Sequence, residues 1–263
     1  MRYTTTGVLA LCLIAMLAAC SPSRERGGPV TTVAATAVPG PAATSVPASR
    51  WRALLVAGDD ASPAFDNGVD AMRATLQMLG VPTIAALTSM PEQVAPGRAL
   101  ATTASLNGSL RATGAVSGDA CLVFLTSHGD TGGLLLRRSR ALYSPVQLEA
   151  ALTAGCGAAP TVVVVSACHS GTFLTDAMRK PNRVVLTAAR RDRSSFGCGA
   201  ASRYTYFDAC LVDAMQGATT WRDVHARATS CVSDLEGKLG AKPPSLPQAF
   251  FGAAVSDLRL PGR

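Results

Sequence analysis

Residues 162 to 171 read Val-Val-Val-Val-Ser-Ala-Cys-His-Ser-Gly, and this stretch decides the fold. Consecutive β-branched residues bounded by small ones are typical of a strand that is buried on both faces of a sheet. The strand runs into one cysteine, Cys168, and then into Ser170 and Gly171, which suit a tight turn. Upstream, Leu-Val-Phe-Leu-Thr over residues 122–126 precedes Ser-His-Gly-Asp over residues 127–130. The pattern predicts two buried strands, one that ends near a thiol and one that ends near an imidazole.

Strand-like and helical patterns alternate along the chain from Trp51 onward. Such alternation favours an α/β fold with a mostly parallel central sheet and helices on both faces. The strands that we expect cover residues 53–57, 83–87, 121–126, 161–166 and 183–188, and the helices between them cover residues 64–79, 105–113 and 145–154. Further on we expect a hairpin within 132–143, helices over 204–215 and 220–239, and a final apolar run at 249–255.

Composition limits the classes of protein that this chain can belong to. Its 263 residues are 48% hydrophobic, enough for the core of one larger or two smaller domains. The net charge of +7 comes from short arginine clusters, without the basic runs and interleaved aromatic residues that are typical of nucleic-acid binding. We therefore expect no nucleic-acid partner.

The first fifty residues resemble an export and anchoring segment. Arg2 precedes an apolar run over residues 8–19 that is too short to span a bilayer, as in a secretory signal peptide. Leu17-Ala18-Ala19-Cys20 resembles the bacterial lipobox, in which cleavage precedes the cysteine and its thiol is acylated. We expect a lipoprotein signal over 1–19, lipidation at Cys20 and a membrane-anchored protein of the bacterial cell envelope, with an ordinary signal peptide as the alternative. The Pro-, Ala- and Thr-rich residues 20–50 predict an extended tether, followed by one domain over 51–263.

The chemistry of the chain is expected where the two central strands end, because active sites of parallel α/β sheets lie at the carboxyl ends of strands. A cysteine nucleophile with a histidine base is the interpretation that we favour for Cys168 and His128. A helix that begins after Cys168 would lower the pKa of its thiol. The backbone N–H groups of Gly129 and Cys168 are candidate oxyanion donors. The alternative is an inert buried thiol at position 168.

The other two histidines are weaker candidates. His169 is adjacent to the thiol in sequence and is expected to point away from it, and His225 is expected to be a packing or surface residue. The histidines and acids lack the spacing of a zinc site, so we expect neither a metal nor another cofactor.

These motifs resemble those of the legumain (asparaginyl endopeptidase) family of cysteine peptidases. The resemblance rests on Ser-His-Gly at 127–129, Ser-Ala-Cys-His-Ser-Gly at 166–171, Leu-Thr-Ala-Ala at 186–189, Ser-Ser-Phe-Gly-Cys at 194–198 and Thr-Tyr-Phe-Asp at 205–208. It implies a caspase-like fold and hydrolysis of peptide bonds through a thioester acyl-enzyme. It also implies Cys168 as the nucleophile, His128 as the base and Gly129 as an oxyanion donor, in an endopeptidase that acts on peptides or proteins.

The chain departs from the family where substrate is recognised. In family members that cleave after Asn, the pocket carries an Arg and a Glu, and these positions fall here at Asp66 and Ser166. Asp208 is a plausible counterpart of the pocket's Asp, with Ser194 as a possible neighbour, and an Asn that orients the histidine falls at Ala64. These substrate-binding candidates predict a loss of Asn specificity and favour a basic side chain in the substrate. The alternative for Asp66 is a helix cap.

Two further points follow from the resemblance and the cysteines. The same family includes transamidases, so transfer to an amine of envelope proteins is one alternative function, and a non-catalytic peptide-binding lipoprotein is another. Five cysteines remain besides Cys12, Cys20 and Cys168, so at least one is expected to stay free; they are Cys121, Cys156, Cys198, Cys210 and Cys231. We expect a buried thiol at Cys121, and no redox role for Cys168 because no Cys-x-x-Cys pair accompanies it.

Overall fold

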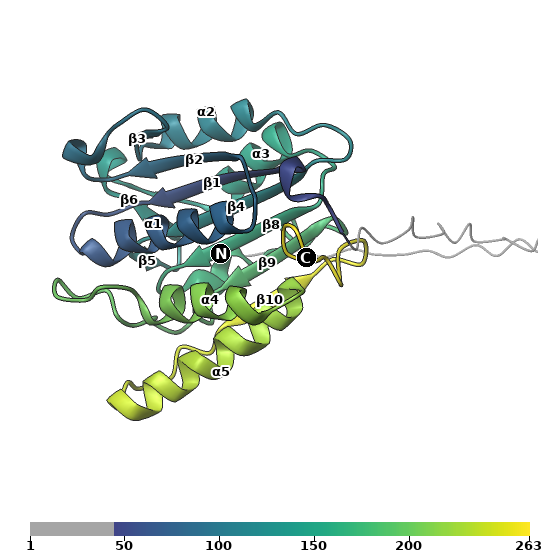
Figure 1. Ribbon diagram of the computed structural model, residues 1–263. Coiled ribbons are helices and arrows are strands. Elements are labelled where there is room, and N and C mark those ends of the chain that lie inside the picture. The colour runs from purple at the N-terminus through teal and green to yellow at the C-terminus, as the bar shows by residue number, and fades with distance from the viewer. Residues whose placement is uncertain (1–44) are drawn as a thin grey trace, which may run out of the picture. The chain divides into compact units, whose positions relative to one another are not determined.

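A computed structural model describes residues 45–263 of the chain (Figure 1). Within these residues the main sheet has seven strands in the order β10-β9-β8-β4-β1-β2-β3. All neighbouring strands are parallel except β10, which pairs antiparallel with β9. This confirms the expected sheet, to which the structure adds the short β3 and places part of the final apolar run as β10. The strands are β1 (Trp51–Ala57), β2 (Thr83–Thr88), β3 (Arg98–Leu100), β4 (Ala120–Thr126), β8 (Thr161–Ser166), β9 (Arg183–Thr187) and β10 (Gln248–Phe251).

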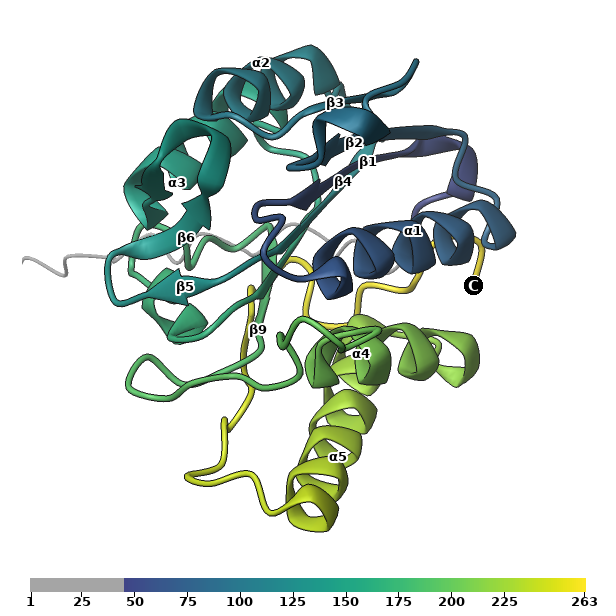
Figure 2. The ribbon, with the colours of Figure 1, turned by 90° about the vertical axis from the view of Figure 1, so that its left-hand side faces the viewer.

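Helices cover both faces of this sheet, as expected, and Figure 2 shows the two layers on either side of it. One face carries α1 (Pro63–Met78), α4 (Tyr206–Gly217) and α5 (Trp221–Leu239), and the other carries α2 (Thr103–Thr113) and α3 (Pro145–Gly155). The four valines of β8 explain why the strand is so apolar. Val162 and Val164 pack into the core beneath α1, α4 and α5, whereas residues 163 and 165 pack into the core beneath α2 and α3.

A small antiparallel sheet follows β4 directly. It consists of β5 (Gly129–Asp130), β6 (Gly133–Leu136) and β7 (Ala141–Tyr143), so the hairpin expected within 132–143 is confirmed. Four short 3-10 helices complete the described elements: η1 (Ala48–Arg50), η2 (Pro91–Gln93), η3 (Arg137–Ser139) and η4 (Ser170–Phe173).

Hydroxyl side chains fix where the five α-helices begin. Each accepts a hydrogen bond from a backbone N–H in the first turn, which satisfies one of the donors left unpaired at a helix start. These residues are Ser62 for α1, Thr102 for α2, Ser144 for α3, Thr205 for α4 and Thr220 for α5.

The packed part of the chain begins before residue 51. Val46 is buried in the core, and its carbonyl accepts a hydrogen bond from the Trp51 indole at 3.1 Å. The expected boundary between tether and domain therefore falls inside a packed segment. The expected signal peptide, the lipidation site Cys20 and most of the tether lie outside the described residues. Within residues 45–263, no helix combines the length and hydrophobicity that a membrane span needs.

Two disulfides connect elements of the domain. Cys121 of β4 is bonded to Cys156 after α3, and Cys210 of α4 is bonded to Cys231 of α5. The expectation of a buried thiol at Cys121 is therefore wrong, because its side chain points to the face that α3 covers, where Cys156 lies within bonding distance. Among the described residues, the cysteines that remain free are Cys168 and Cys198.

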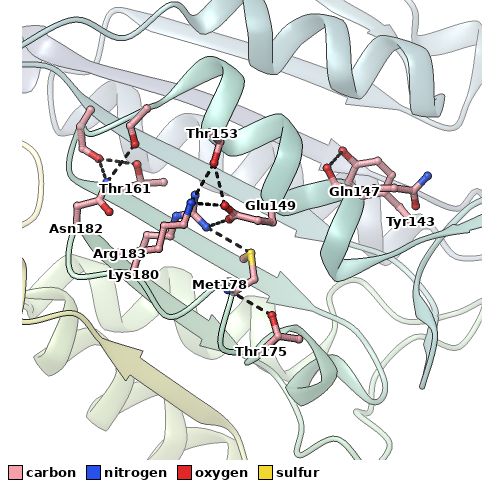
Figure 3. Close-up of polar contacts among 12 residues, drawn as sticks. Tyr143, Gln147, Glu149, Thr153, Thr161, Thr175, Met178, Lys180, Asn182 and Arg183 are labelled. Carbon is pink, nitrogen blue, oxygen red and sulfur yellow. Dashed lines mark hydrogen bonds and ion pairs between the residues drawn. The ribbon is translucent and has the colours of Figure 1, made fainter.

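A buried ion-pair cluster attaches α3 to the start of β9 (Figure 3). Arg183 is 1% exposed, and it pairs with Glu149 of α3, which also binds Lys180. These cations hold the pKa of Glu149 below its usual range, although partial burial acts in the opposite direction. The cluster lies near the amino end of β9, away from the chemistry described below, and it has a structural role because a buried guanidinium needs a paired acid.

Candidate active site

Strand register aligns three polar residues at the carboxyl edge of the sheet. Ala57 of β1 lies opposite Thr126 of β4, which in turn lies opposite Ser166 of β8. Asp59, His128 and Cys168 each follow two positions after one of these strand residues. The three side chains therefore leave adjacent strands in one row, at the edge where parallel α/β sheets carry their active sites.

Asp59 holds the imidazole of His128. Its Oδ2 lies 2.9 Å from His128 Nδ1, and its carboxylate is almost fully buried. The backbone N–H of Ala61 donates to the other oxygen, Oδ1, at 3.0 Å, and Arg137 lies 3.6 Å from it. Phe65 packs edge-on against the imidazole with 5.0 Å between ring centroids. The ring is thus fixed, with Nε2 left to face a reacting group.

Asp59 was missed in the sequence, where only the residue at the family's Asn position, Ala64, was considered. The signal was present: an acidic pair, Asp59 and Asp60, directly follows a predicted strand. Only the order of the strands reveals that this strand lies beside the one that leads to His128.

The Cys168 thiol is half-buried and is enclosed by the segment after β9. The backbone N–H of Ser195 donates to Cys168 Sγ at 3.4 Å, and the thiol faces the Ser195 carbonyl at 3.6 Å. Burial raises the pKa of the Cys168 thiol, although hydrogen bonds from Ser195 and Ser194 act in the opposite direction. Ser194, expected as a pocket neighbour, thus lies beside the thiol itself.

The expected helix after Cys168 is absent from the described chain. Only η4, a four-residue 3-10 turn, follows the cysteine, because His169 takes a left-handed conformation (φ 56°) and turns the chain. The expected lowering of the thiol pKa by a helix end is therefore wrong. The His169 ring Nδ1 lies 3.0 Å from the Arg191 carbonyl, which directs it away from the role of a base. His225 of α5 packs edge-on against Phe251 of β10, as a packing residue does.

Gly129 lies in close contact with the backbone of Cys168. A Cβ atom at this position would come within 2.5 Å of the Cys168 carbonyl oxygen and 2.8 Å of the Ala167 side chain. Only glycine allows this approach. The turn after His128 and the turn at Cys168 therefore meet, which is the arrangement that an oxyanion site of backbone donors requires.

Cys198 is a second free thiol at this site, and sequence reasoning gave it no role. It lines the same cavity as His128, and its interaction with the imidazole, together with that of Asp59, raises the pKa of His128 to about 9. The same interaction lowers the pKa of Cys198. As the structure stands, the imidazole is therefore paired with Cys198 as well as with Asp59.

One small cavity joins these groups. It has a volume of about 10 Å³, room for roughly one water molecule, and its lining includes Cys168, His128, Cys198, Phe65, Ser166 and Thr205. A peptide substrate needs more room than this.

Asp208 lies behind one wall of this cavity. Its carboxyl contacts the hydroxyls of Thr126, Ser166 and Thr205, with the Thr126 Oγ1 donating to Oδ2 at 2.7 Å. Its Oδ1 has no hydrogen-bond partner although the residue is fully buried. Burial raises the pKa of this carboxyl to about 6.

Asp66 does not join the other substrate-binding candidates. Its carboxylate pairs with Arg98 of β3, which also binds Asp70. Asp66 lies on α1 toward the β2 and β3 side of the sheet, whereas Ser166 and Asp208 lie toward β4 and β8. Ser62 is the residue that caps α1, so the helix-cap alternative for Asp66 is also wrong.

Metal ligands do not gather in the described part of the chain. Between residues 45 and 263, no group of three or more His, Cys, Asp or Glu side chains is arranged to hold a metal ion.

Comparison with known proteins identifies the family. The sequence model of the peptidase C13 family matches residues 98–230, which include His128, Cys168 and Cys198. The chain belongs to the peptidase C13 family. This is the legumain-like family that the sequence motifs resemble, so this C13 protein is a cysteine-type peptidase with peptide or protein substrates.

A solved structure supports the fold of this C13 peptidase. Caspase-1 from Spodoptera frugiperda matches it with a TM-score of 0.57 and 13% sequence identity, over 81% of this chain and 90% of that one. The C13 peptidase thus has the expected caspase-like α/β fold. No curated protein matches the sequence.

The paired imidazole makes a testable prediction about proton binding. In NMR titrations of the full-length C13 peptidase, we expect His128 to titrate near pH 9, since both Cys198 and Asp59 favour its charged form. Cys198→Ser removes the first of these contacts and should shift the titration toward the usual value of about 6.5. His225, whose pKa burial lowers, is the internal control and should not respond. A wild-type His128 that titrates near its usual value contradicts this pairing.

Proposed function

We propose that this cysteine peptidase is an endopeptidase with Cys168 as the nucleophile and His128 as the general base and acid. The observation that carries the proposal is the alignment of Asp59, His128 and Cys168 on three adjacent strands. In the reaction, His128 accepts the thiol proton and the thiolate attacks the substrate carbonyl. His128 then protonates the leaving amine, and water hydrolyses the thioester on Cys168.

Asp59 is the positioning residue of this mechanism. Its hydrogen bond with Nδ1 fixes the tautomer in which Nε2 accepts the thiol proton once Cys198 has left the imidazole, and its charge stabilises the imidazolium that forms. Because Asp59 is buried, this interaction is little screened by solvent.

Backbone donors at Gly129 and Cys168 form the oxyanion hole in this proposal. The close approach of Gly129 to Cys168 supports it, because it brings the backbone of the two turns together beside the thiol. Before attack, the substrate must displace segment 194–198, which encloses the thiol and holds Cys198 on the imidazole.

Cleavage assays on the full-length chain test the mechanism. Cys168→Ala should abolish hydrolysis of a peptide library, and His128→Ala should reduce kcat by about 10²–10⁴-fold, the usual contribution of general acid–base catalysis. Asp59→Asn should reduce kcat by a smaller factor, with KM little changed. Asp60→Asn is the matched control, because the adjacent Asp60 pairs with Arg137 and Arg138 instead of His128 and should keep wild-type cleavage.

Two outcomes contradict this account. Cleavage that survives Cys168→Ala excludes Cys168 as the nucleophile, and equal losses for Asp59→Asn and Asp60→Asn exclude a specific role for Asp59. Product masses measured with and without an added amine distinguish hydrolysis from transamidation, since only a transamidase couples the acyl group to the amine.

We further propose that the cavity wall of Ser166, Thr205 and Asp208 selects a basic substrate side chain. The Ser166 and Thr205 hydroxyls lie 3.3 Å apart, and the Asp208 carboxyl lies behind them with one oxygen unpaired. A lysine or arginine side chain that replaces the contact between the hydroxyls would reach this oxygen and ionise the carboxyl. Asp66 takes no part, because Arg98 neutralises it. Ser194 would act from the thiol side of the pocket.

Substitution of Asp208 should change the substrate preference and, at pH 7, raise the stability of the fold. Asp208→Asn should abolish the preference for basic residues in a cleavage profile, whereas Asp66→Asn, the control, should leave the profile unchanged.

The pKa of Asp208 is raised in the fold, so the folded state binds more protons than the unfolded state between pH 3.8 and about 6. Wild-type stability therefore falls as pH rises through this range, and at pH 7 Asp208→Asn should be more stable by on the order of 2 kcal/mol in urea unfolding.

The specificity proposal has a clear contrary result. Faster cleavage of the asparagine version of a substrate than of its lysine or arginine version contradicts it, and so does a basic preference that survives Asp208→Asn.

We also propose that the protein is exported and anchored by a lipid at Cys20. The two disulfides support an oxidising compartment, where such bonds persist. Expressed in a bacterium, the full-length chain should fractionate with membranes, and Cys20→Ser should release it into the soluble fraction. Membrane association that persists without Cys20 contradicts the lipid anchor.

A further inference from the structure

The free thiols of Cys168 and Cys198 line one small cavity, and segment 194–198 contacts the first and carries the second. Ser195 holds Cys168 through its backbone, and Cys198, three residues further on, contacts His128. Cys168 and Cys198 both line the cavity of about 10 Å³, so the two thiols border the same small space. No sequence motif couples them, since they are thirty positions apart in the chain.

The other described cysteines explain why this pair is unusual. Cys121, Cys156, Cys210 and Cys231 are joined in disulfides, so the fold is compatible with an oxidising environment. Cys168 and Cys198 are the cysteines of residues 45–263 that stay as thiols. Two thiols at one site of such a protein are exposed to disulfide-containing molecules.

The two thiols differ in acidity. Contact with His128 lowers the pKa of Cys198, whereas burial raises the pKa of Cys168. The thiolate is the species that attacks a disulfide. Cys198 is therefore the thiol that reacts first, and Cys168 the thiol that resolves the product.

We propose that Cys198 and Cys168 form a reversible modification site, at which a low-molecular-weight disulfide converts the two thiols into a Cys168–Cys198 disulfide. One part of the inference rests on the proposed function: the disulfide blocks catalysis because Cys168 is the nucleophile. The bond itself depends on the position and chemistry of the two thiols.

The chemistry balances in two exchange steps. The Cys198 thiolate attacks one sulfur of the small disulfide and releases one thiolate, leaving a mixed disulfide on Cys198. The Cys168 thiolate then attacks the Cys198 sulfur and releases the second. The protein loses two electrons and two protons, and the small disulfide is reduced to two thiols. A dithiol reductant reverses both steps.

Local backbone geometry holds Cys198 at the cavity. Gly197 (φ 83°) packs so closely against the next helix start that a Cβ atom there would lie 2.7 Å from the Tyr206 ring. The Gly199 carbonyl accepts a hydrogen bond from Ser62 at 2.9 Å, and the Phe196 carbonyl accepts one from the Tyr206 N–H at 3.0 Å. The segment is therefore anchored on both sides of Cys198, which keeps this thiol at the cavity that Cys168 also lines.

The position of Cys198 also affects the reduced site. Cys198 interacts with the imidazole that the Cys168 thiol needs as a base, so a substrate that displaces segment 194–198 frees both the cavity and His128. A disulfide would fix this segment over the nucleophile and prevent its displacement. Oxidation would thus stabilise the closed arrangement that the structure already has.

The test treats the full-length protein with glutathione disulfide and maps its cysteines by peptide mass. In wild type we expect a Cys168–Cys198 cross-linked peptide pair without bound glutathione, and loss of peptidase activity that dithiothreitol restores. Cys168→Ala should instead accumulate glutathione on Cys198, because the resolving thiol is missing. The Cys121–Cys156 and Cys210–Cys231 bonds serve as controls and should remain.

Cys198→Ser supplies the matched kinetic comparison. With each rate normalised to that variant's own reduced activity, we expect inactivation at least about tenfold slower than in wild type, since the more acidic thiol is gone. Separate glutathione adducts on Cys168 and Cys198 without a cross-link overturn the proposal, and so does equal inactivation of wild type and Cys198→Ser. Peptide mass detects the cross-link whether or not the protein is active. If the proposed catalytic role of Cys168 is wrong, the reduced protein shows no peptidase activity, and the cross-link can still form.

Discussion

Parallel pairing of β1, β4 and β8 is the constraint on which the site depends. The register places Ala57, Thr126 and Ser166 side by side, and each strand then continues for two residues to Asp59, His128 and Cys168. A shift of one residue in either pairing would separate the imidazole from the carboxylate or from the thiol. The apolar side chains of these strands, packed under helices on both faces, hold this register.

Two buried carboxyl groups at this edge of the sheet serve the proposed chemistry, and burial of their charge lowers the stability of the fold. Asp59 and Asp208 are buried carboxyl groups, and burial of a charge is costly unless it is paired. Asp59 is paired with His128 and with the Ala61 N–H, whereas Asp208 keeps one oxygen without a partner. A buried carboxyl oxygen without a partner is costly to the fold, which is why we interpret Asp208 as part of substrate recognition.

Much of the fold could be predicted from sequence because strong patterns coincide with it. The valines of β8 and the apolar run of β4 predicted buried strands, and the residues after them predicted the thiol and the imidazole. The pairing of Asp66 with Arg98 could not be predicted, because the position of Asp66 in the chain does not reveal which side of α1 it occupies, and Arg98 lies in the short β3, which no pattern predicted. Asp59 and Cys198 escaped for a related reason, since strand order and loop path bring them to His128.

The measurement that tests the account most directly is the location of the acyl group during turnover. The full-length protein would be mixed with a peptide ester, whose acylation is fast, then quenched in acid within milliseconds and mapped by peptide mass. The account predicts a thioester on Cys168, absent from Cys198 and strongly reduced in His128→Ala. An acyl group on Cys198, or ester turnover without any acylated cysteine, would contradict it.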